Sequence, residues 1–305
     1  MQIEGHSRDE KRKNGLGYFF KTAFSPLTAT LKFFNDHFKG LLFVVLLILL
    51  FAPASKEVAK PYNLQTIKLS GPIMDAGKVL EQIESAQKND HVKGVLFEVN
   101  SPGGAVAPSV EIAYAIRELA KKKPVVVYAS GILASGSYYA SIWGEKIIAN
   151  PGSVVGSIGV ILEGADLSGL MSKIGIRTQS VQAGKYKKVG TPERPWKPYE
   201  KAELNKVIQD TYEMFTSDVA NARKLDLKKR NVWADAHIFT ARQAKSVGLV
   251  DAVGVLQSAK KEVEKLSGVK EARWNKEDKF EKLIKKLSAE AAVTLFTYFP
   301  PVVLK

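Results

Sequence analysis

Ile132-Leu-Ala-Ser-Gly-Ser-Tyr-Tyr-Ala140 leads from an apolar strand, through small residues, into a helical pattern. The run before it, 124–129, is short, β-branched and apolar, which is typical of a strand buried on both faces of a mostly parallel sheet. We expect residues 130–136 to form the turn, with a helix beginning at Ser135. The unpaired N–H groups of that helix would point at a ligand bound beside Ser135.

Two roles are open for Ser135 on this stretch alone. A serine between alanine and glycine at the start of a helix is suited to be a nucleophile beside an oxyanion site. The same position is also favoured for an ordinary N-cap, whose side chain accepts a hydrogen bond from the first turn of the helix. The choice between them depends on a partner base.

Strand and helix patterns alternate on both sides of this stretch. The pattern predicts strands at 64–69, 92–99, 146–149 and 154–161, and helices after Asp75, after Gly104 and at 199–224, 240–247 and 255–266. Such alternation with short connections requires right-handed crossovers and predicts an α/β layer fold.

Two connections differ from the others. Asn100-Ser-Pro-Gly-Gly104 ends the second strand, and its consecutive glycines either turn N–H groups toward a ligand or form a plain strand-to-helix turn. Residues 181–198 form a long basic loop. In the helix that follows, Leu204, Ile208, Tyr212, Phe215 and Val219 recur at helical spacing, which indicates core or a subunit contact.

Composition excludes several classes of protein. The 305 residues are 45% hydrophobic, enough for a sizeable core, and the absence of cysteine excludes disulfides and thiolate metal sites. The net charge of +14 is spread along the chain, without a Lys/Arg block interleaved with aromatics. This distribution argues against nucleic acid and favours an anionic membrane surface as the partner.

The run 40–55 carries no charge over 16 residues and is the predicted membrane anchor. At 1.5 Å per residue it spans roughly 24 Å, so Lys39 and Lys56 would snorkel at its ends. Seven Lys and Arg residues precede it, which by the positive-inside rule keeps the N-terminus cytoplasmic and exports the rest. A cleaved signal peptide ending near Ala52-Pro53-Ala54 is the alternative.

These features divide the chain into four predicted parts. Residues 1–39 form a cytoplasmic basic and aromatic tail, 40–55 the anchor and 56–268 the catalytic domain. Residues 269–305 hold a charged amphipathic helix at 276–286 and an apolar end from Val293, a combination that usually packs against a partner subunit or a membrane.

A serine nucleophile needs a base. The histidines are His6 in the tail, His37 beside the anchor, His91 at a helix–strand junction and His237 in an expected loop. Each is interpreted as structural or surface. A lysine is able to act as base when burial and positive neighbours lower its pKa by roughly 3 units from about 10.4. Lys187 has lysines on its flanks, although such a residue is ordinarily a solvated surface side chain.

Four motifs in order decide between these alternatives. Asn100-Ser-Pro-Gly-Gly104, Ala134-Ser-Gly-Ser-Tyr-Tyr139, Val155-Gly-Ser-Ile-Gly-Val160 and Gly184-Lys-Tyr-Lys187 together resemble the signal peptide peptidase SppA family of serine–lysine peptidases. The resemblance covers about residues 62–265 and matches the short, single-repeat form, as opposed to the double-length protease IV.

The resemblance implies a crotonase/Clp-protease-like fold of repeated ββα units. It implies Ser135 as nucleophile, Lys187 as general base, and the amides of Gly104 and Gly136 as the oxyanion hole, with no metal or cofactor. It also implies a membrane-bound homo-oligomeric ring, commonly an octamer, whose dyads are completed between neighbours. The substrates would be remnant signal peptides or other hydrophobic peptides.

The chain departs from the family pattern at two places. Ser137 stands where the family usually has a second glycine, and Asp235-Ala-His-Ile-Phe-Thr-Ala241 replaces a pattern that usually reads Asp-Gly-Arg-Val-Tyr-Thr-Gly. Other membrane or lipoprotein substrates, a non-catalytic membrane scaffold, and an acyl-CoA-processing crotonase relative remain the alternative functions.

Overall fold

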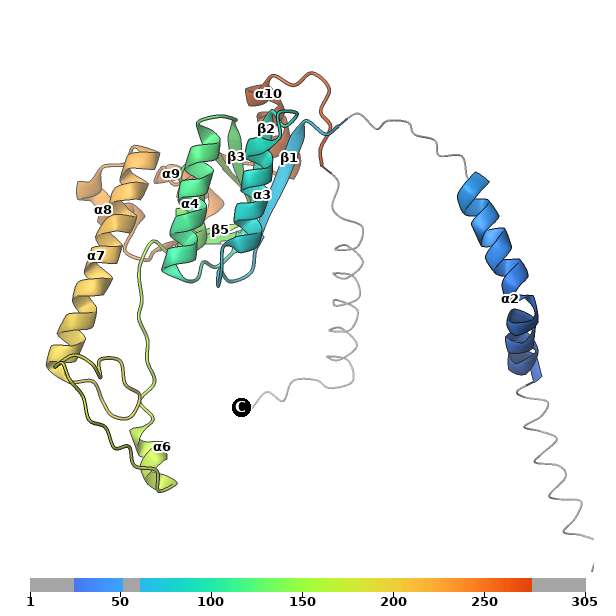
Figure 1. Cartoon of the computed structure of the whole chain (residues 1–305). Helices are drawn as coiled ribbons and strands as arrows, with labels where there is room; N and C mark the ends of the chain where they lie inside the picture. The colour runs from blue at the N-terminus through green and yellow to red at the C-terminus, as the bar shows by residue number, and fades with distance from the viewer. Residues whose placement is uncertain (1–24, 52–60, 276–305) are drawn as a thin grey trace, which may run out of the picture. The chain divides into compact units, whose positions relative to one another are not determined.

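The computed structural model describes residues 25–51 and 61–275 (Figure 1). It divides the chain into two compact units, Met1–Lys60 and Pro61–Lys305. The predictions for residues 1–24, for the end of the anchor at 52–55 and for the helix and apolar end at 276–305 lie outside the described residues.

One helix, α2 (Ser25–Phe51), forms the described part of the first unit and is 27 residues long. It includes residues 40–51 of the predicted anchor. Among the residues that the structure describes, no helix is both long enough and apolar enough to cross a membrane.

A mixed sheet organises the second unit, which confirms the predicted α/β class. Strands β1 to β4 and β7 lie side by side in that order and all run parallel. Strand β5 pairs with the far end of β3, also in parallel, and β6 pairs with β5 in the antiparallel direction. The strands are β1 (Leu64–Ser70), β2 (Gly94–Ser101), β3 (Val125–Ala134), β4 (Lys146–Ala149), β5 (Val154–Gly156), β6 (Ile238–Thr240) and β7 (Ala252–Val253).

Helices cover both faces of this sheet (Figure 1). The larger core lies under α3 and α4, and a smaller one lies under α10 on the opposite face. Within residues 61–275, the helices and the 3-10 turn are α3 (Gly77–Lys88), α4 (Val106–Ala120), α5 (Gly136–Ser141), α6 (Ser168–Lys173), α7 (Pro198–Arg223), η1 (Leu227–Lys229), α8 (Arg230–Trp233), α9 (Ala241–Ser246) and α10 (Leu256–Ser267).

Strand β3 is the central strand, and it is longer than predicted. Residues 125–129 are buried, as their β-branched composition indicates. The turn expected at 130–136 was placed too early, because β3 continues to Ala134. After pairing with β4 as far as Ala129, it pairs with β5 through residues 132–134. The chain leaves the direction of β3 only at Ser135.

The apolar stripe of helix α7 is fully buried only toward its C-terminal end. Of the predicted apolar stripe, Phe215 and Val219 enter the core, whereas the members nearer the N-terminus are half-buried. Figure 1 shows this half of α7 reaching away from the sheet toward the loop that carries α6. The exposed Val207 on this half is consistent with the subunit contact that the sequence left open.

Candidate active site

Ser135 stands at the junction between β3 and α5 in a strained conformation. Its φ is 52° and its ψ is −125°, a region that costs a residue with a side chain about 1–3 kcal/mol. The Ser135 N–H donates to the carbonyl oxygen of Gly156 (2.8 Å), and the Ser135 carbonyl accepts from Tyr139 N–H (3.0 Å). The side chain makes no capping bond, so the structure does not support an ordinary N-cap. Strain maintained by the surrounding backbone is typical of a functional turn.

Three glycines make the approach to Ser135 possible. Gly103 has a φ of 94°, and a Cβ there would lie 2.6 Å from the Gly136 nitrogen. A Cβ at Gly104 would lie 2.2 Å from the carbonyl oxygen of Ile73, and one at Gly136 would lie 2.3 Å from Ser109 Oγ. The predicted need for glycine at 103–104 therefore has two causes, conformation at the first and close packing at the second.

The predicted oxyanion donors, the N–H groups of Gly104 and Gly136, lie close to each other. A Cβ built on Gly136 would lie 3.3 Å from the nitrogen of Gly104. Within residues 61–275, neither of these two amides donates a hydrogen bond to the protein. Two unpaired N–H groups beside a serine hydroxyl are the arrangement that stabilises a tetrahedral oxyanion.

A cavity of about 100 Å³ opens beside these groups. Ser135, Gly104 and Gly136 all line it, so three of the four predicted site residues surround one space. One wall comes from α7, and residues 159–161, after β5, close another side. The other lining residues are Val106, Ser109, Val110, Tyr139, Gly159, Val160, Ile161, Thr211, Met214 and Phe215.

Tyr139 holds α7 against α5 at the base of this cavity. Its hydroxyl donates to Asp218 Oδ2, and its ring meets Phe215 edge-on at 5.0 Å between centroids. Burial, and then the bond to Asp218, hold the pKa of Tyr139 above its usual value, so the hydroxyl stays protonated and remains a donor.

Lys187, the predicted base, does not line the cavity of its own chain. It lies exposed in the loop that rests on the N-terminal end of α7, where the hydroxyl of Tyr199 donates to the carbonyl of Lys185 (3.4 Å). Between Tyr199 and Thr211, which does line the cavity, α7 rises about 18 Å. The structure thus separates Lys187 from Ser135 within one subunit.

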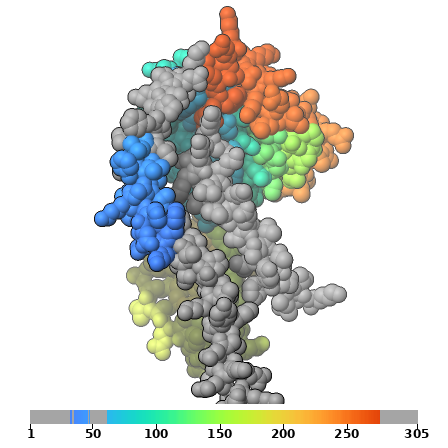
Figure 2. Space-filling model, turned by 90° about the vertical axis from the view of Figure 1, so that its right-hand side faces the viewer, coloured from blue at the N-terminus to red at the C-terminus, as the bar shows by residue number. Residues whose placement is uncertain are grey.

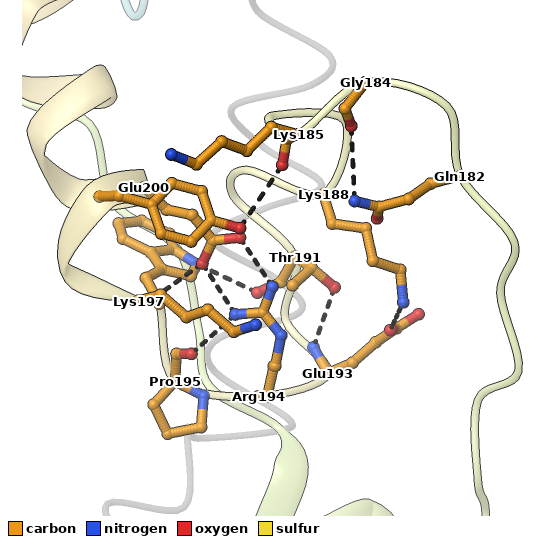
Figure 3. Close-up of polar contacts among 12 residues, drawn as sticks. Gln182, Gly184, Lys185, Lys188, Thr191, Glu193, Arg194, Pro195, Lys197 and Glu200 are labelled. Atoms are coloured by element: carbon orange, nitrogen blue, oxygen red, sulfur yellow. Dashed lines mark hydrogen bonds and ion pairs between the residues drawn. The ribbon is translucent and has the colours of Figure 1, made fainter.

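Polar contacts fix the loop around Lys187 to α7 (Figure 3). Arg194 bonds Glu200 through both guanidinium nitrogens at 2.7 Å, and Lys188 pairs with Glu193 at 2.7 Å. The Lys185 ammonium lies 5.0 Å from the ring centre of Tyr199. The bonds from Arg194 and from the Lys197 N–H lower the pKa of Glu200 to about 2. These contacts hold the loop in one conformation, and Lys187 lies exposed on it.

Ser137, the first departure, is a buried structural hydroxyl. Its Oγ donates to the carbonyl of Ser101 (2.6 Å) or Ala134 (2.9 Å) and accepts from the Ala134 N–H (2.9 Å). It does not line the cavity. Ser137 joins the end of β2 to the turn that carries the nucleophile.

The second departure places an alanine where the backbone favours glycine. Asp235 and Ala236 have φ values of 57° and 56°. The Ala236 N–H donates to the carbonyl of Ile158 (3.0 Å), and the Ser157 N–H donates to the carbonyl of His237 (2.7 Å). This turn therefore supports the segment that closes the cavity. His237 itself is exposed, and none of the described histidines lines the cavity.

Sequence reasoning missed the contribution of α7 to the cavity. Thr211, Met214 and Phe215 are spaced three and four residues apart and share one face of the helix. That spacing was visible in the sequence, but of these three only Phe215 was singled out, as core or a subunit contact. Within the described ranges, no cluster of three or more His, Asp or Glu residues is arranged to hold a metal ion.

Comparison with known proteins identifies the family. The model of peptidase family S49 matches residues 117–270, which is half of the chain. This chain belongs to peptidase family S49. The Clp protease model matches residues 54–152, in agreement with the mixed sheet, and the resemblance inferred from the four motifs is confirmed.

Three relatives of this S49 member have protease or peptidase names. A protein of Methanocaldococcus jannaschii named as a protease is 45% identical over 195 residues, 64% of this chain and 63% of its own length. A protein of Enterococcus faecium named as a signal peptide peptidase SppA is 38% identical over 227 residues, 66% of this chain and 64% of its own. Protease 4 of Salmonella typhi is 31% identical over 191 residues, 62% of this chain and 31% of its own.

Proposed function

We propose that this chain is a serine endopeptidase in which Ser135 attacks an extended apolar peptide and Lys187 of a neighbouring subunit acts as the general base. The observation that carries the proposal is the cavity where the strained Ser135 meets the free amides of Gly104 and Gly136. Membership of family S49 supports the same reaction class.

The reaction follows from these groups. A neutral lysine amine accepts the Ser135 hydroxyl proton while Oγ attacks the peptide carbonyl carbon. The amides of Gly104 and Gly136 bind the resulting oxyanion. The lysine returns the proton to the leaving amine, and a water molecule, deprotonated by the same lysine, hydrolyses the acyl-enzyme.

We assign the base to a neighbouring subunit because Ser135 and Lys187 lie apart within one subunit. The loop bearing Lys187 also exposes large apolar side chains, which usually marks a contact surface. These include Leu170, Ile174, Ile176 and Val181. A head-to-tail contact through this loop, repeated around a closed ring, would complete every site with the lysine of the next subunit. An octamer is the ring size that we propose.

The membrane placement is a further part of the proposal. It is supported by the uncharged run 40–55 between Lys39 and Lys56, with seven basic residues before it. Remnant signal peptides, which are apolar and left in the membrane, are the substrates we propose; one relative has a signal peptide peptidase name. Alkaline carbonate extraction of full-length chain, beside a variant lacking residues 40–55, tests the anchor. Release of both forms would contradict it.

Hydrolysis of a fluorogenic apolar peptide by the full-length chain tests the function. Ser135→Ala and Lys187→Ala are each expected to lower kcat by about a thousandfold or more without loss of assembly. Lys173→Ala is the matched control, because it removes another exposed lysine from the segment between β5 and α7, one that takes no part in the contacts that fix the loop, and it is expected to keep activity. Full activity of Lys187→Ala would contradict the assigned base, and an assembled but inactive wild type would favour the membrane scaffold.

A further inference from the structure

The pairing of β2 with β3 is interrupted just before the two strands reach the active site. On β2 the paired positions advance by two residues, from Val99 to Ser101. Over the same interval on β3 they advance by four, from Ala129 to Leu133, so β3 contains a bulge. Strand β3 pairs with β4 before this bulge and with β5 after it. Bulges that redirect a strand are frequent beside active sites.

The side chain of Asn100 lies in this bulge. Its Oδ1 accepts a hydrogen bond from the Ile132 N–H (2.9 Å). Gly131 leaves room for the amide, because a Cβ there would lie 2.5 Å from Asn100 Oδ1. The Ser130 hydroxyl adds a longer bond to the carbonyl of Val99 (3.3 Å). The Asn100 amide therefore joins β2 to β3 across the interruption in their ladder.

Asn100 lies on the same face of the sheet as α10. Leu96, four residues earlier on β2, is buried in the smaller core under α10, and alternation along the strand puts Asn100 on that face. The side chains of Asn100 and Ile132 are nevertheless exposed. In Figure 2, the orange atoms of α10 and the residues after it form the upper surface of the face shown, with green atoms directly below them. Burial on this face therefore contributes little to the bulge, and the hydrogen bond contributes more.

The two segments that Asn100 joins contain the nucleophile and one oxyanion donor. The first runs from Ile132 along β5 to Ser135, whose N–H donates to the carbonyl of Gly156 (2.8 Å). The second runs from Asn100 itself to Gly104. Asn100 does not line the cavity, so an effect of its side chain on the reaction passes through these two segments.

We propose that Asn100 is a positioning residue for the reaction of Ser135. Its side chain holds residues 132–134 in register on β5 and so fixes Ser135 Oγ relative to the amides of Gly104 and Gly136. The inference rests on the proposed function, since it concerns the same site. A nucleophile displaced by about 1 Å loses up to about a hundredfold in rate, so a bond that fixes this register affects the rate although it lies outside the cavity.

Steady-state hydrolysis of the fluorogenic apolar peptide by full-length variants tests this role. Asn100→Ala is expected to lower kcat about tenfold and to change KM less than about twofold, because the substrate contacts stay and the geometry of attack is lost. Water partly replaces an exposed bond, so this loss is smaller than that of a variant at Ser135. Asn100→Asp keeps an acceptor oxygen and is expected to recover kcat to within about twofold of wild type.

Two conditions make the kinetic comparison specific. All kcat values are read at the plateau of the pH profile, where a change in the pKa of the base has no effect. Asn89→Ala is the matched control, because Asn89 Oδ1 accepts from the His91 N–H (3.0 Å) in the connection between α3 and β2. That variant is expected to keep the kcat of wild type even if it lowers the Tm.

Gly131→Ala tests the same contact from the other strand. The three atoms nearest to the added methyl group all belong to the Asn100 side chain, so the methyl group displaces that amide. We expect kcat to fall about fivefold in the wild-type background, but by less than about twofold further when Asn100 is already alanine. Losses that multiply in the double variant would overturn the proposal.

Hydrogen exchange of residues 130–137 makes the test independent of activity. In Asn100→Ala we expect protection to be lost at Ile132 and also at Ser135, and to return at both in Asn100→Asp. A loss confined to Ile132 would overturn the proposal, as would a kcat of Asn100→Ala equal to that of wild type. An inactive wild type would contradict the proposed function instead, and the protection of Ser135 in Asn100→Ala would still decide whether Asn100 positions it.

Discussion

Ser135 illustrates how much a single backbone conformation contributes to the site. A φ of 52° is unfavourable for serine, and the turn maintains it because the Ser135 N–H donates to β5 and the Ser135 carbonyl accepts from α5. The family resemblance implied roles for this residue and for the amides of Gly104 and Gly136, and the structure places all three residues beside one cavity. They come together because they lie close in sequence or at the ends of adjacent strands.

Ser137→Ala is expected to destabilise the chain although it leaves the nucleophile in place. The variant removes the bonds to Ser101 and Ala134 and leaves two buried backbone groups without a partner, which costs about 1–3 kcal/mol. Chemical unfolding measures this loss. Ser141→Ala, another buried serine of α5 that bonds only the carbonyl of Ser137, is the control and should cost less. Equal losses would contradict a special role for Ser137.

Ala236→Gly is expected to stabilise the turn that supports the cavity. Alanine at a φ of 56° carries a left-handed penalty of about 1–2 kcal/mol, and glycine avoids it at a smaller entropic cost. Thermal unfolding should show a higher Tm by a few degrees. Ala234→Gly, in a buried position outside the left-handed region, should lower the Tm. A lower Tm for Ala236→Gly would contradict the claim that the backbone is strained at Ala236.

At the scale of elements, the loop around Lys187 should loosen in acid. Glu200 has a folded pKa of about 2 against a usual value of 4.5, because Arg194 and the Lys197 N–H bind its carboxylate. A depressed folded pKa stabilises the loop above pH 4.5, and this contribution is lost as the pH falls toward 2. Hydrogen exchange of residues 185–197 measures the effect.

The control for this prediction is Arg194→Gln, which removes the main cause of the shift. In that variant the exchange of the loop should already be faster at pH 7 and should vary less between pH 4.5 and 2.5. If the protection factors of the loop amides, which exclude the intrinsic pH dependence of exchange, stay unchanged in the wild type across this range, the role of the Arg194–Glu200 pair is contradicted.

The sequence predicted these elements unevenly, for physical reasons. Strand β2 and helix α7 were predicted because burial on both faces and a 3.6-residue spacing leave strong patterns. The end of β3 was misplaced because its pairing with β5 is a tertiary contact that small residues at 130–134 do not reveal. The short strand β6 was missed for the same reason. Likewise, no local pattern shows that α7 supplies a wall of the cavity.

At the scale of the whole molecule, the separation of Ser135 from Lys187 is the feature that most needs an explanation. The loop is fixed to the N-terminal end of α7 by the Arg194–Glu200 ion pair and the Lys185–Tyr199 ring contact, so a large movement toward its own cavity would break them. A contact between subunits brings the two residues together without that loss. The catalytic unit would then be a pair of neighbours, and activity would depend on assembly.

Complementation between two inactive variants tests this central claim most directly. Full-length Ser135→Ala and Lys187→Ala chains, each with its own affinity tag, are co-expressed, and mixed assemblies are isolated through both tags. Random mixing in a ring gives about a quarter of the sites an intact serine from one subunit and an intact lysine from the next, so about a quarter of wild-type activity is expected. Mixed assemblies that stay as inactive as the single variants would contradict a site shared between subunits.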